Sequence, residues 1–161
     1  MKPRVYLETS FISYLAGRLS SDLVTLQRQL SSQRWWERNR GEFDLYVPQA
    51  VYEECMRGDE QAVQNRLALL KEATLLPVTP EAMDIARRLI DPAPFPKNAE
   101  VDAIHIAVAT VYACDYLLTW NFKHINNARL KRAATRIIED YGYQPTIICT
   151  PDELLGSDGG T

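Results

Sequence analysis

Short apolar runs alternate along the chain with longer stretches in which apolar residues recur at every third or fourth position. Each run is unbroken, rich in β-branched, aromatic or leucine residues, and followed by polar residues or proline. This pattern predicts strands that are buried on both faces of a parallel sheet. Five such strands are expected, over residues 5–7, 43–47, 75–78, 116–119 and 146–149.

The longer stretches have the apolar spacing of helices, and several begin with a start signal. Asp59 precedes one pattern as a cap, and Thr79-Pro80-Glu81 places a proline and an acid in a first turn. Asn98 is expected to cap a helix over 99–113, which is apolar around most of its circumference and therefore central. The apolar positions, helix by helix, are Leu23, Leu26 and Leu30; Val63, Leu67 and Leu70; Ile85, Leu89 and Ile90; and Val101, Ile104, Ala107, Val108 and Val111.

Alternation of strands and helices predicts an α/β fold, a three-layer α/β/α sandwich with right-handed crossovers. The chain of 161 residues has the length of one domain, expected over 1–155, with 156–161 as a flexible C-terminal tail. Three prolines within 91–97 predict a stiff loop and not a linker, because one core serves both flanking segments.

Composition excludes several classes of protein. The formal net charge of −3 and the pI of about 5.4 are not those of a general nucleic-acid binder, so an anionic substrate needs a local basic patch or metal ions. Cys55, Cys114 and Cys149 lie far apart, as expected of reduced thiols in a cytoplasmic protein. No apolar run approaches the roughly 18 residues of a membrane span, and therefore no membrane partner is expected.

Several common catalytic motifs are absent from the sequence. There is no G-x-G-x-x-G dinucleotide loop, no Walker lysine loop and no G-x-S-x-G nucleophile elbow. His105 and His124 do not form the H-E-x-x-H pair of a zinc protease. A response-regulator-like or flavodoxin-like domain fits the alternation of elements but lacks support, because the first strand is not followed by paired acids and there is no phosphate loop.

Acidic and polar residues instead stand near the carboxyl ends of the predicted strands. In an open α/β sheet these ends share one edge, where ligands bind, and carboxylates gathered there repel each other unless a cation neutralises them. Mg²⁺ and Mn²⁺ prefer such oxygen ligands. The residues concerned are Glu8 with Thr9 and Ser10 after the first strand, Glu53 and Glu54 in the helix after the second, Asp102 in the second turn of the central helix, and Asn121 two residues past the fourth strand.

Each of these residues also has a structural explanation. A Glu53–Glu54 pair is commonly a solvated helix face, and Glu8 is equally consistent with a loop acid or a cap of the next helix. Asp102 in a nearly apolar helix is costly unless it is paired or bound to a metal, although the helix dipole also favours an acid there. His105, one turn further on, is better explained as a core or supporting histidine than as a ligand.

Four segments together resemble the signature of the PIN domain, the nuclease fold of VapC toxins. They are Leu7-Glu8-Thr9-Ser10, Val47-Pro48 through Glu54, Val101 through Ala107, and Leu117 through Phe122, and the resemblance spans roughly 3–150. It implies a parallel five-stranded sheet of order 3-2-1-4-5 and metal-dependent endoribonuclease activity. It also implies cleavage of RNA phosphodiester bonds with Mg²⁺ or Mn²⁺ as cofactor, and the role of toxin in a type II toxin–antitoxin system.

Carried over by position, the resemblance makes Glu8, Glu54, Asp102 and Asn121 the catalytic set. Glu8, Asp102 and Glu54 are the expected metal ligands, and the supporting residues are Thr9, Ser10, Glu53 and His105. The chain departs from the family at two positions, since Glu8 replaces a shorter aspartate and the neutral Asn121 replaces a fourth acid. One firmly bound metal ion is therefore expected, and a catalytically weak or inactive module that binds RNA or protein is the alternative.

Substrate binding needs positive charge, which the sequence supplies near Asn121. No acid occurs between Tyr116 and Ile138, and the basic residues there are Lys123, Arg129, Lys131, Arg132 and Arg136. They are predicted to contact RNA phosphates, the alternative being helix charges that serve solubility. Trp35, Trp36 and Trp120 are candidates for base stacking, although the first two are better explained by the core or a dimer contact. The expected partners are RNA, an antitoxin protein and a second copy of the chain.

Overall fold

The computed structural model describes residues 1–91 and 95–155, and the predicted tail over 156–161 lies outside these residues. The five strands form one parallel sheet of order β3-β2-β1-β4-β5, which confirms the predicted α/β/α class and strand order. The strands are β1 (Arg4–Leu7), β2 (Asp44–Pro48), β3 (Thr74–Leu76), β4 (Tyr116–Leu118) and β5 (Ile147–Cys149). The α-helices are α1 (Thr9–Ala16), α2 (Leu23–Arg38), α3 (Gln49–Cys55), α4 (Glu60–Leu70), α5 (Pro80–Ile90), α6 (Glu100–Val111) and α7 (Ala128–Asp140).

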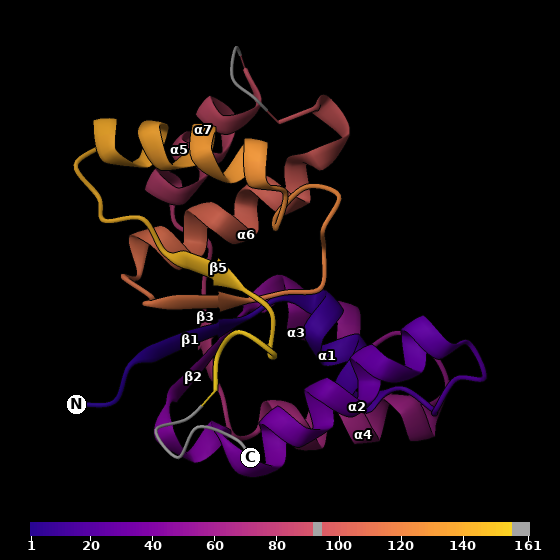
Figure 1. Ribbon diagram of the computed structural model, residues 1–161. Coiled ribbons are helices and arrows are strands. Elements are labelled where there is room, and N and C mark those ends of the chain that lie inside the picture. Colours follow the sequence, from indigo (N-terminus) through magenta and orange to yellow (C-terminus); the bar gives the residue numbers. More distant parts are fainter. Residues whose placement is uncertain (92–94, 156–161) are drawn as a thin grey trace.

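Helices cover both faces of the sheet, as Figure 1 shows, with α5, α6 and α7 on one side and α1, α2, α3 and α4 on the other. The alternation of side chains along β1 divides the core accordingly. Tyr6 belongs to the cluster under α5 and α6, whereas Val5 and Leu7 belong to the cluster under α1 and α2. Because β1 is the central strand and its Val5, Tyr6 and Leu7 are fully buried, the end of β1 is a rigid support for the residues that follow it.

The prediction that strands are buried on both faces is confirmed for the central strand β1 but is wrong for the edge strands β3 and β5. Leu75 is 44% exposed and Ile147 is 58% exposed, because each edge strand has a neighbouring strand on only one side. Short edge strands of three residues limit unwanted pairing with other chains.

Two of the predicted helix starts are confirmed. The side chain of Asp59 accepts a hydrogen bond from the Ala62 backbone N–H, and Thr79 does the same for Ala82, with Pro80 in the first turn of α5. Each cap satisfies a backbone N–H that has no partner within its helix.

The predicted cap at Asn98 is wrong. Residues Lys97–Ala99 form a 3₁₀ turn, closed by the Ala99 N–H on the Pro96 carbonyl, and α6 begins at Glu100. Asn98 therefore lies inside the turn, one residue before the position from which a side chain can cap α6.

The buried face of α2 also differs from the prediction. Leu23, Val24 and Leu30 are 80%, 61% and 45% exposed, while the helix buries Trp35, Trp36 and the small or amide side chains of Gln29, Ser31 and Ser32. Polar side chains are buried there because they have partners: Gln29 bonds the Arg18 carbonyl and the loop at Ser20. Within the described residues, no helix is both long and apolar enough to cross a bilayer.

Candidate active site

Three of the residues predicted at one edge of the sheet, Glu8, Asp102 and Asn121, are brought together after the carboxyl ends of β1 and β4. Glu8 directly follows β1, and Thr119 directly follows β4, which pairs with β1. Asp102 lies in the first turn of α6, not in the second turn as predicted, because α6 starts later than the sequence indicates. The beginning of α6 lies over the ends of these strands.

Glu8 is buried, with 4% of its surface exposed, and it serves as the N-cap of α1. Its Oε2 accepts hydrogen bonds from the Ser10 backbone N–H at 3.0 Å and from the Thr119 hydroxyl at 2.7 Å, and a third from the Ser10 hydroxyl. The capping role considered from the sequence is thus confirmed, and it holds one carboxylate oxygen in place. The extra methylene of glutamate allows the carboxylate to reach back to the α1 backbone and across to β4.

Asp102 is held by two partners that both come from the loop after β4. Its Oδ1 accepts from Nδ2 of Asn121 at 3.0 Å, and its Oδ2 lies 2.7 Å from Nδ1 of His124. The Asn121 amide oxygen in turn accepts the His124 backbone N–H at 3.0 Å. Asn121 and His124 therefore orient the Asp102 side chain as a rigid unit with their loop.

A continuous chain of hydrogen bonds joins Glu8 to Asp102. The Thr119 hydroxyl bonds the Glu8 carboxylate and accepts the Asn121 backbone N–H at 3.0 Å, and the Asn121 side chain bonds Asp102. Two acids that are separated by almost a hundred residues in the sequence are thus fixed relative to each other at one edge of the sheet.

His105 lies beneath the acids and is 3% exposed, with its Nδ1 2.9 Å from the Tyr6 hydroxyl. Burial lowers the pKa of His105 below its ordinary value of 6.5, while the negative charges of Glu8, Asp102 and Glu54 oppose this shift. The same burial, together with Glu8 and Glu54, raises the pKa of Tyr6. His105 is consequently a neutral imidazole that supports the site from the core.

Glu54 also acts on the site electrostatically. Its charge raises the pKa values of both His105 and Tyr6, and its side chain is half-buried, whereas the neighbouring Glu53 is exposed. Glu8, Asp102 and Glu54 thus all oppose the effect of burial on His105. Within residues 1–91 and 95–155, no lysine or arginine lies within ion-pair distance of these three carboxylates.

Removing His105 is expected to change how stability depends on pH. As the pH falls below about 6.5, an unfolded histidine binds a proton that the buried imidazole does not, so the free energy of unfolding decreases by up to about 1.4 kcal/mol per pH unit. The variant His105→Gln loses this dependence, since glutamine does not titrate. Urea denaturation of both proteins between about pH 7.5 and 5.5 measures the difference. Parallel curves for the two proteins would contradict the neutral state of His105.

The chemistry of the three carboxylates suits a divalent cation. None of them pairs with a lysine or arginine among the described residues, and they provide the oxygen donors and negative charge that Mg²⁺ and Mn²⁺ prefer. Among the described residues, however, no three acid, histidine or cysteine side chains are grouped closely enough to hold one ion. The donor set therefore fits such a cation by its chemistry, while the spacing of the side chains does not enclose one in this arrangement.

Comparison with known proteins gives the family. A family model described as PIN domain matches residues 5–130, about three quarters of the chain, and includes Glu8, Glu54, Asp102 and Asn121. The chain belongs to the PIN domain family. No curated protein matches the sequence of this PIN domain.

The solved structures that resemble this PIN domain include two from VapC toxin systems. VapC20 from Mycobacterium tuberculosis, described as a sarcin-ricin loop cleaving toxin, is 17% identical with a TM-score of 0.54, over 74% of this chain and 91% of that one. VapBC2 from Rickettsia felis, solved bound to a DNA fragment from their promoter, is 12% identical with a TM-score of 0.54, over 91% of this chain and 97% of that one. At these identities the likeness shows a shared fold.

Sequence reasoning missed two residues of the PIN domain that the structure places at the centre of the site. Thr119 is fully buried between Glu8 and Asn121, and the half-buried His124 contacts Asp102. Thr119 looks like the last residue of an apolar strand, and His124 follows Asn121 in a polar loop. The available signal was the spacing of Thr119, Asn121 and His124 after β4, which puts three polar side chains in one tight loop.

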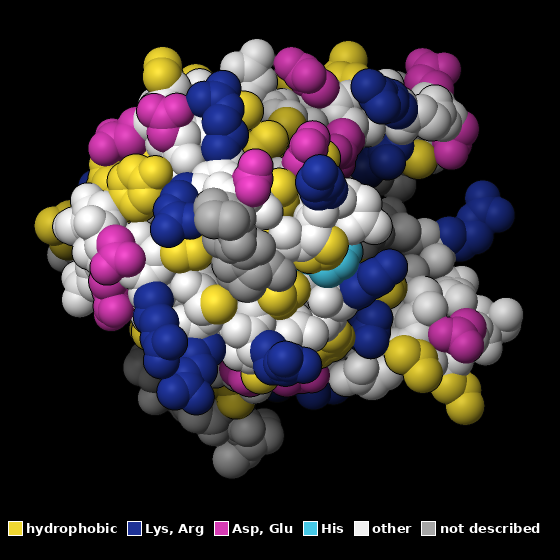
Figure 2. Space-filling model, turned by 90° about the horizontal axis from the view of Figure 1, so that it is seen from above, with side chains coloured by type: hydrophobic (Ala, Val, Ile, Leu, Met, Phe, Trp, Pro, Cys, Tyr) yellow, Lys and Arg dark blue, Asp and Glu magenta, His cyan; other side chains and the backbone are white. Residues whose placement is uncertain are grey.

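The predicted basic segment lies on the loop after β4 and on α7. Lys123, Arg129, Arg132 and Arg136 are exposed, and Lys131 is half-buried with its Nζ 2.7 Å from the Asn126 side-chain oxygen. Figure 2 shows lysine and arginine side chains spread over one face of the PIN domain. Contact of this segment with RNA stays a prediction. Trp35, Trp36 and Trp120 are all buried, so none of them offers a ring face for stacking.

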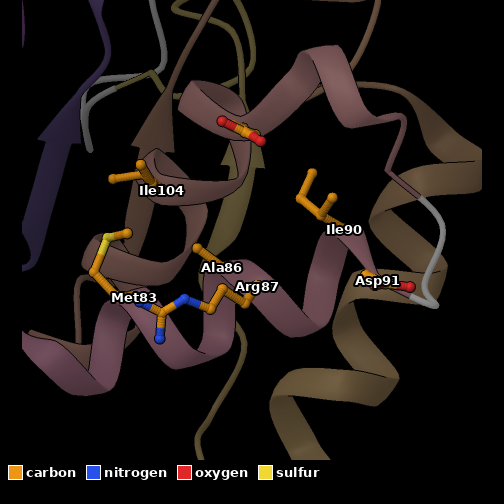
Figure 3. Close-up of a pocket in the computed structure, with 7 residues that line it drawn as sticks. Met83, Ala86, Arg87, Ile90, Asp91 and Ile104 are labelled. Atoms are coloured by element: carbon orange, nitrogen blue, oxygen red, sulfur yellow. The ribbon is translucent and has the colours of Figure 1, made fainter.

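A cavity of about 420 Å³ lies between α5 and α6 (Figure 3). Met83, Ile90 and Ile104 line its apolar wall, and the charged residues around it are Arg87, Asp91 and Glu100. None of the predicted site residues of the PIN domain lines this cavity.

Proposed function

We propose that this PIN domain is a metal-dependent endoribonuclease that hydrolyses RNA phosphodiester bonds and acts as the toxin of a type II toxin–antitoxin system. The observation that carries the proposal is the hydrogen-bond chain that fixes Glu8 and Asp102 at the edge of the sheet. The description of VapC20 as a toxin that cleaves the sarcin-ricin loop supports RNA as the substrate class. The likeness to VapBC2 supports an antitoxin as partner.

In this proposal Glu8, Glu54 and Asp102 hold Mg²⁺ or Mn²⁺. A divalent cation supplies activation of a water molecule and offsets the charge that builds on the phosphate during hydrolysis. The protein's own residues position the acids: Ser10 and Thr119 fix the Glu8 carboxylate, and Asn121 and His124 fix that of Asp102. Lys123 and the basic residues of α7 attract the RNA backbone. No protein nucleophile is required.

The second candidate function is a PIN domain that binds RNA or protein without cutting it. Two observations favour it: one Glu8 oxygen is already taken up by three donors, and no three ligand side chains are grouped around one ion within the described ranges. To hold one cation, the side chains of Glu54 and Asp102 would have to move closer together. A module that binds without cutting does not need this movement.

Incubation of the purified protein with single-stranded RNA distinguishes the two functions. We expect cleavage in Mg²⁺ or Mn²⁺, none after addition of EDTA, and recovery when Mn²⁺ is added in excess, because the proposed reaction needs a cation to activate water. Gel electrophoresis of an end-labelled RNA measures this. Cleavage that persists in EDTA would remove the metal from the proposal, and binding without cleavage in Mn²⁺ would favour the second candidate.

A further inference from the structure

Arg28, on α2, is surrounded by aromatic side chains next to the candidate active site. Its guanidinium carbon lies 5.4 Å from the ring centre of Phe122, 5.8 Å from that of Trp120 and 5.9 Å from that of Tyr14. Its Nη1 also donates to the Tyr14 hydroxyl at 3.2 Å. Contacts of this kind hold a guanidinium plane in a fixed orientation through cation–π attraction. We call Tyr14, Arg28, Trp120 and Phe122 the arginine platform.

The positive charge of Arg28 contacts aromatic rings and acts at a distance on Asp22, but it is not neutralised by an ion pair among the described residues. In the part of the chain that the structure describes, no carboxylate oxygen lies within ion-pair distance of it, and its side chain donates one hydrogen bond, to the Tyr14 hydroxyl. A guanidinium has five N–H donors in a planar fork, so most of the donors of this half-buried side chain have no protein acceptor. A preoriented fork with free donors matches the geometry of a phosphate group.

Phe122 provides an apolar surface beside this charge. The residue is 46% exposed, although Arg28 lies over its ring and Trp120 meets that ring at an interplanar angle of 63°. An exposed aromatic ring held by packed neighbours offers a surface on which a nucleobase stacks.

The platform is joined directly to the carboxylates. Trp120 donates its backbone N–H to the Ser10 hydroxyl at 2.8 Å, and this hydroxyl bonds the Glu8 carboxylate. The Trp120 indole N–H donates to Ser32 on α2 at 2.8 Å, which fixes α2 against the loop after β4. Because Asn121 stands between Trp120 and Phe122 and contacts Asp102, the platform begins one residue from the proposed reaction site.

We propose that Arg28 and Phe122 bind one nucleotide of single-stranded RNA beside the cleaved bond, with the guanidinium on a phosphate and the Phe122 ring on an unpaired base. This rests on the proposed function for its choice of ligand. The basic residues of α7 attract any RNA backbone, whereas the platform distinguishes single strands from duplex. A paired base cannot leave its stack to reach the Phe122 ring.

Binding measurements in EDTA test the platform separately from catalysis. The probes are a fluorescein-labelled oligouridine of about 12 nucleotides and an abasic strand of the same length, followed by fluorescence anisotropy. Phe122→Ala is expected to weaken oligouridine binding about tenfold and to leave binding of the abasic strand unchanged. Arg28→Met weakens binding of both strands and reduces the slope of log affinity against log salt by about 0.7, the effect of one phosphate contact.

Two further variants control this experiment. Arg28→Lys keeps the charge but loses the planar stack, and it is expected to retain the salt slope with lower affinity. It keeps the test informative if Arg28→Met does not fold. Arg88→Met removes an exposed arginine from α5, on the opposite face of the sheet, and leaves both affinities unchanged.

The outcomes separate the platform from the nuclease proposal. Three results would overturn the platform. Phe122→Ala could weaken binding of both probes equally, Arg28→Lys and Phe122→Ala could each bind with wild-type affinity, or the wild-type protein could fail to bind oligouridine. If the variants bound both probes normally and still cleaved RNA, the platform would be overturned and the nuclease proposal would stand. Platform-dependent binding without any cleavage in Mn²⁺ would keep the platform and refute the nuclease.

Discussion

Replacing Asp102 by asparagine is expected to reduce the rate of RNA cleavage about a thousandfold, equivalent to about 4 kcal/mol of transition-state stabilisation. The change removes a negative charge at the proposed metal position and adds no bulk. The fold is expected to persist, because an asparagine oxygen can still accept from Asn121 while its amide nitrogen faces the His124 ring. Single-turnover cleavage of labelled RNA in Mn²⁺, with thermal denaturation of the same samples, measures both effects.

A matched control for this experiment is Asp140→Asn, which removes the same charge from an exposed position at the end of α7. Its cleavage rate is expected to equal that of the wild-type protein. If Asp102→Asn retained more than about a tenth of the activity, Asp102 would not be part of the reaction site, since loss of even 1.4 kcal/mol lowers a rate tenfold.

Asn121→Asp is expected to have opposite effects with and without metal. Without metal, the variant loses the 3.0 Å hydrogen bond to Asp102 and places a second carboxylate against the first. Loss of a hydrogen bond to a charged group costs about 2 kcal/mol, which lowers the Tm of a chain of this length by about 4–8 °C. With Mn²⁺ the added charge is neutralised, and a rise in metal affinity of about tenfold or more is expected, together with faster cleavage if the natural site is limited by its neutral Asn121.

Thermal denaturation over a Mn²⁺ titration measures this prediction. Asn65→Asp, which adds the same charge to an exposed position on α4, controls for net charge and is expected to show neither effect. A Tm for Asn121→Asp that equals the wild-type value and does not respond to Mn²⁺ would show that Asn121 and Asp102 do not share a cation site.

The fold was predictable because its signals are local. The unbroken run at β1, the caps at Asp59 and Thr79 and the apolar circumference of α6 each depend on residues within one or two turns of each other. The meeting of Glu8 with Asp102 was predictable for a related reason, because parallel strands bring their carboxyl ends to one edge whatever the details of packing.

The errors involve partners that lie far apart in the sequence. Leu23 and Leu30 have the spacing of a buried face, but α2 turns toward the core the face that contains Ser32, because Ser32 bonds Trp120, 88 residues away. Thr119 likewise reaches Glu8 across 111 residues. No periodic pattern along one segment records such pairs. The start of α6 lies one residue later than predicted, because a 3₁₀ turn that follows Pro96, and not a cap at Asn98, precedes the helix.

All three tryptophans lie in the α1–α2 layer or are hydrogen-bonded to it. Trp35 and Trp36 belong to the core under α1 and α2, and Trp120 is hydrogen-bonded to α2, whereas the core under α5, α6 and α7 contains no tryptophan among its buried residues. Tryptophan emission, excited beyond the absorption of tyrosine, therefore follows melting of the α1–α2 layer. Far-ultraviolet circular dichroism averages over both layers, so disagreement between the two signals would reveal that the layers melt separately.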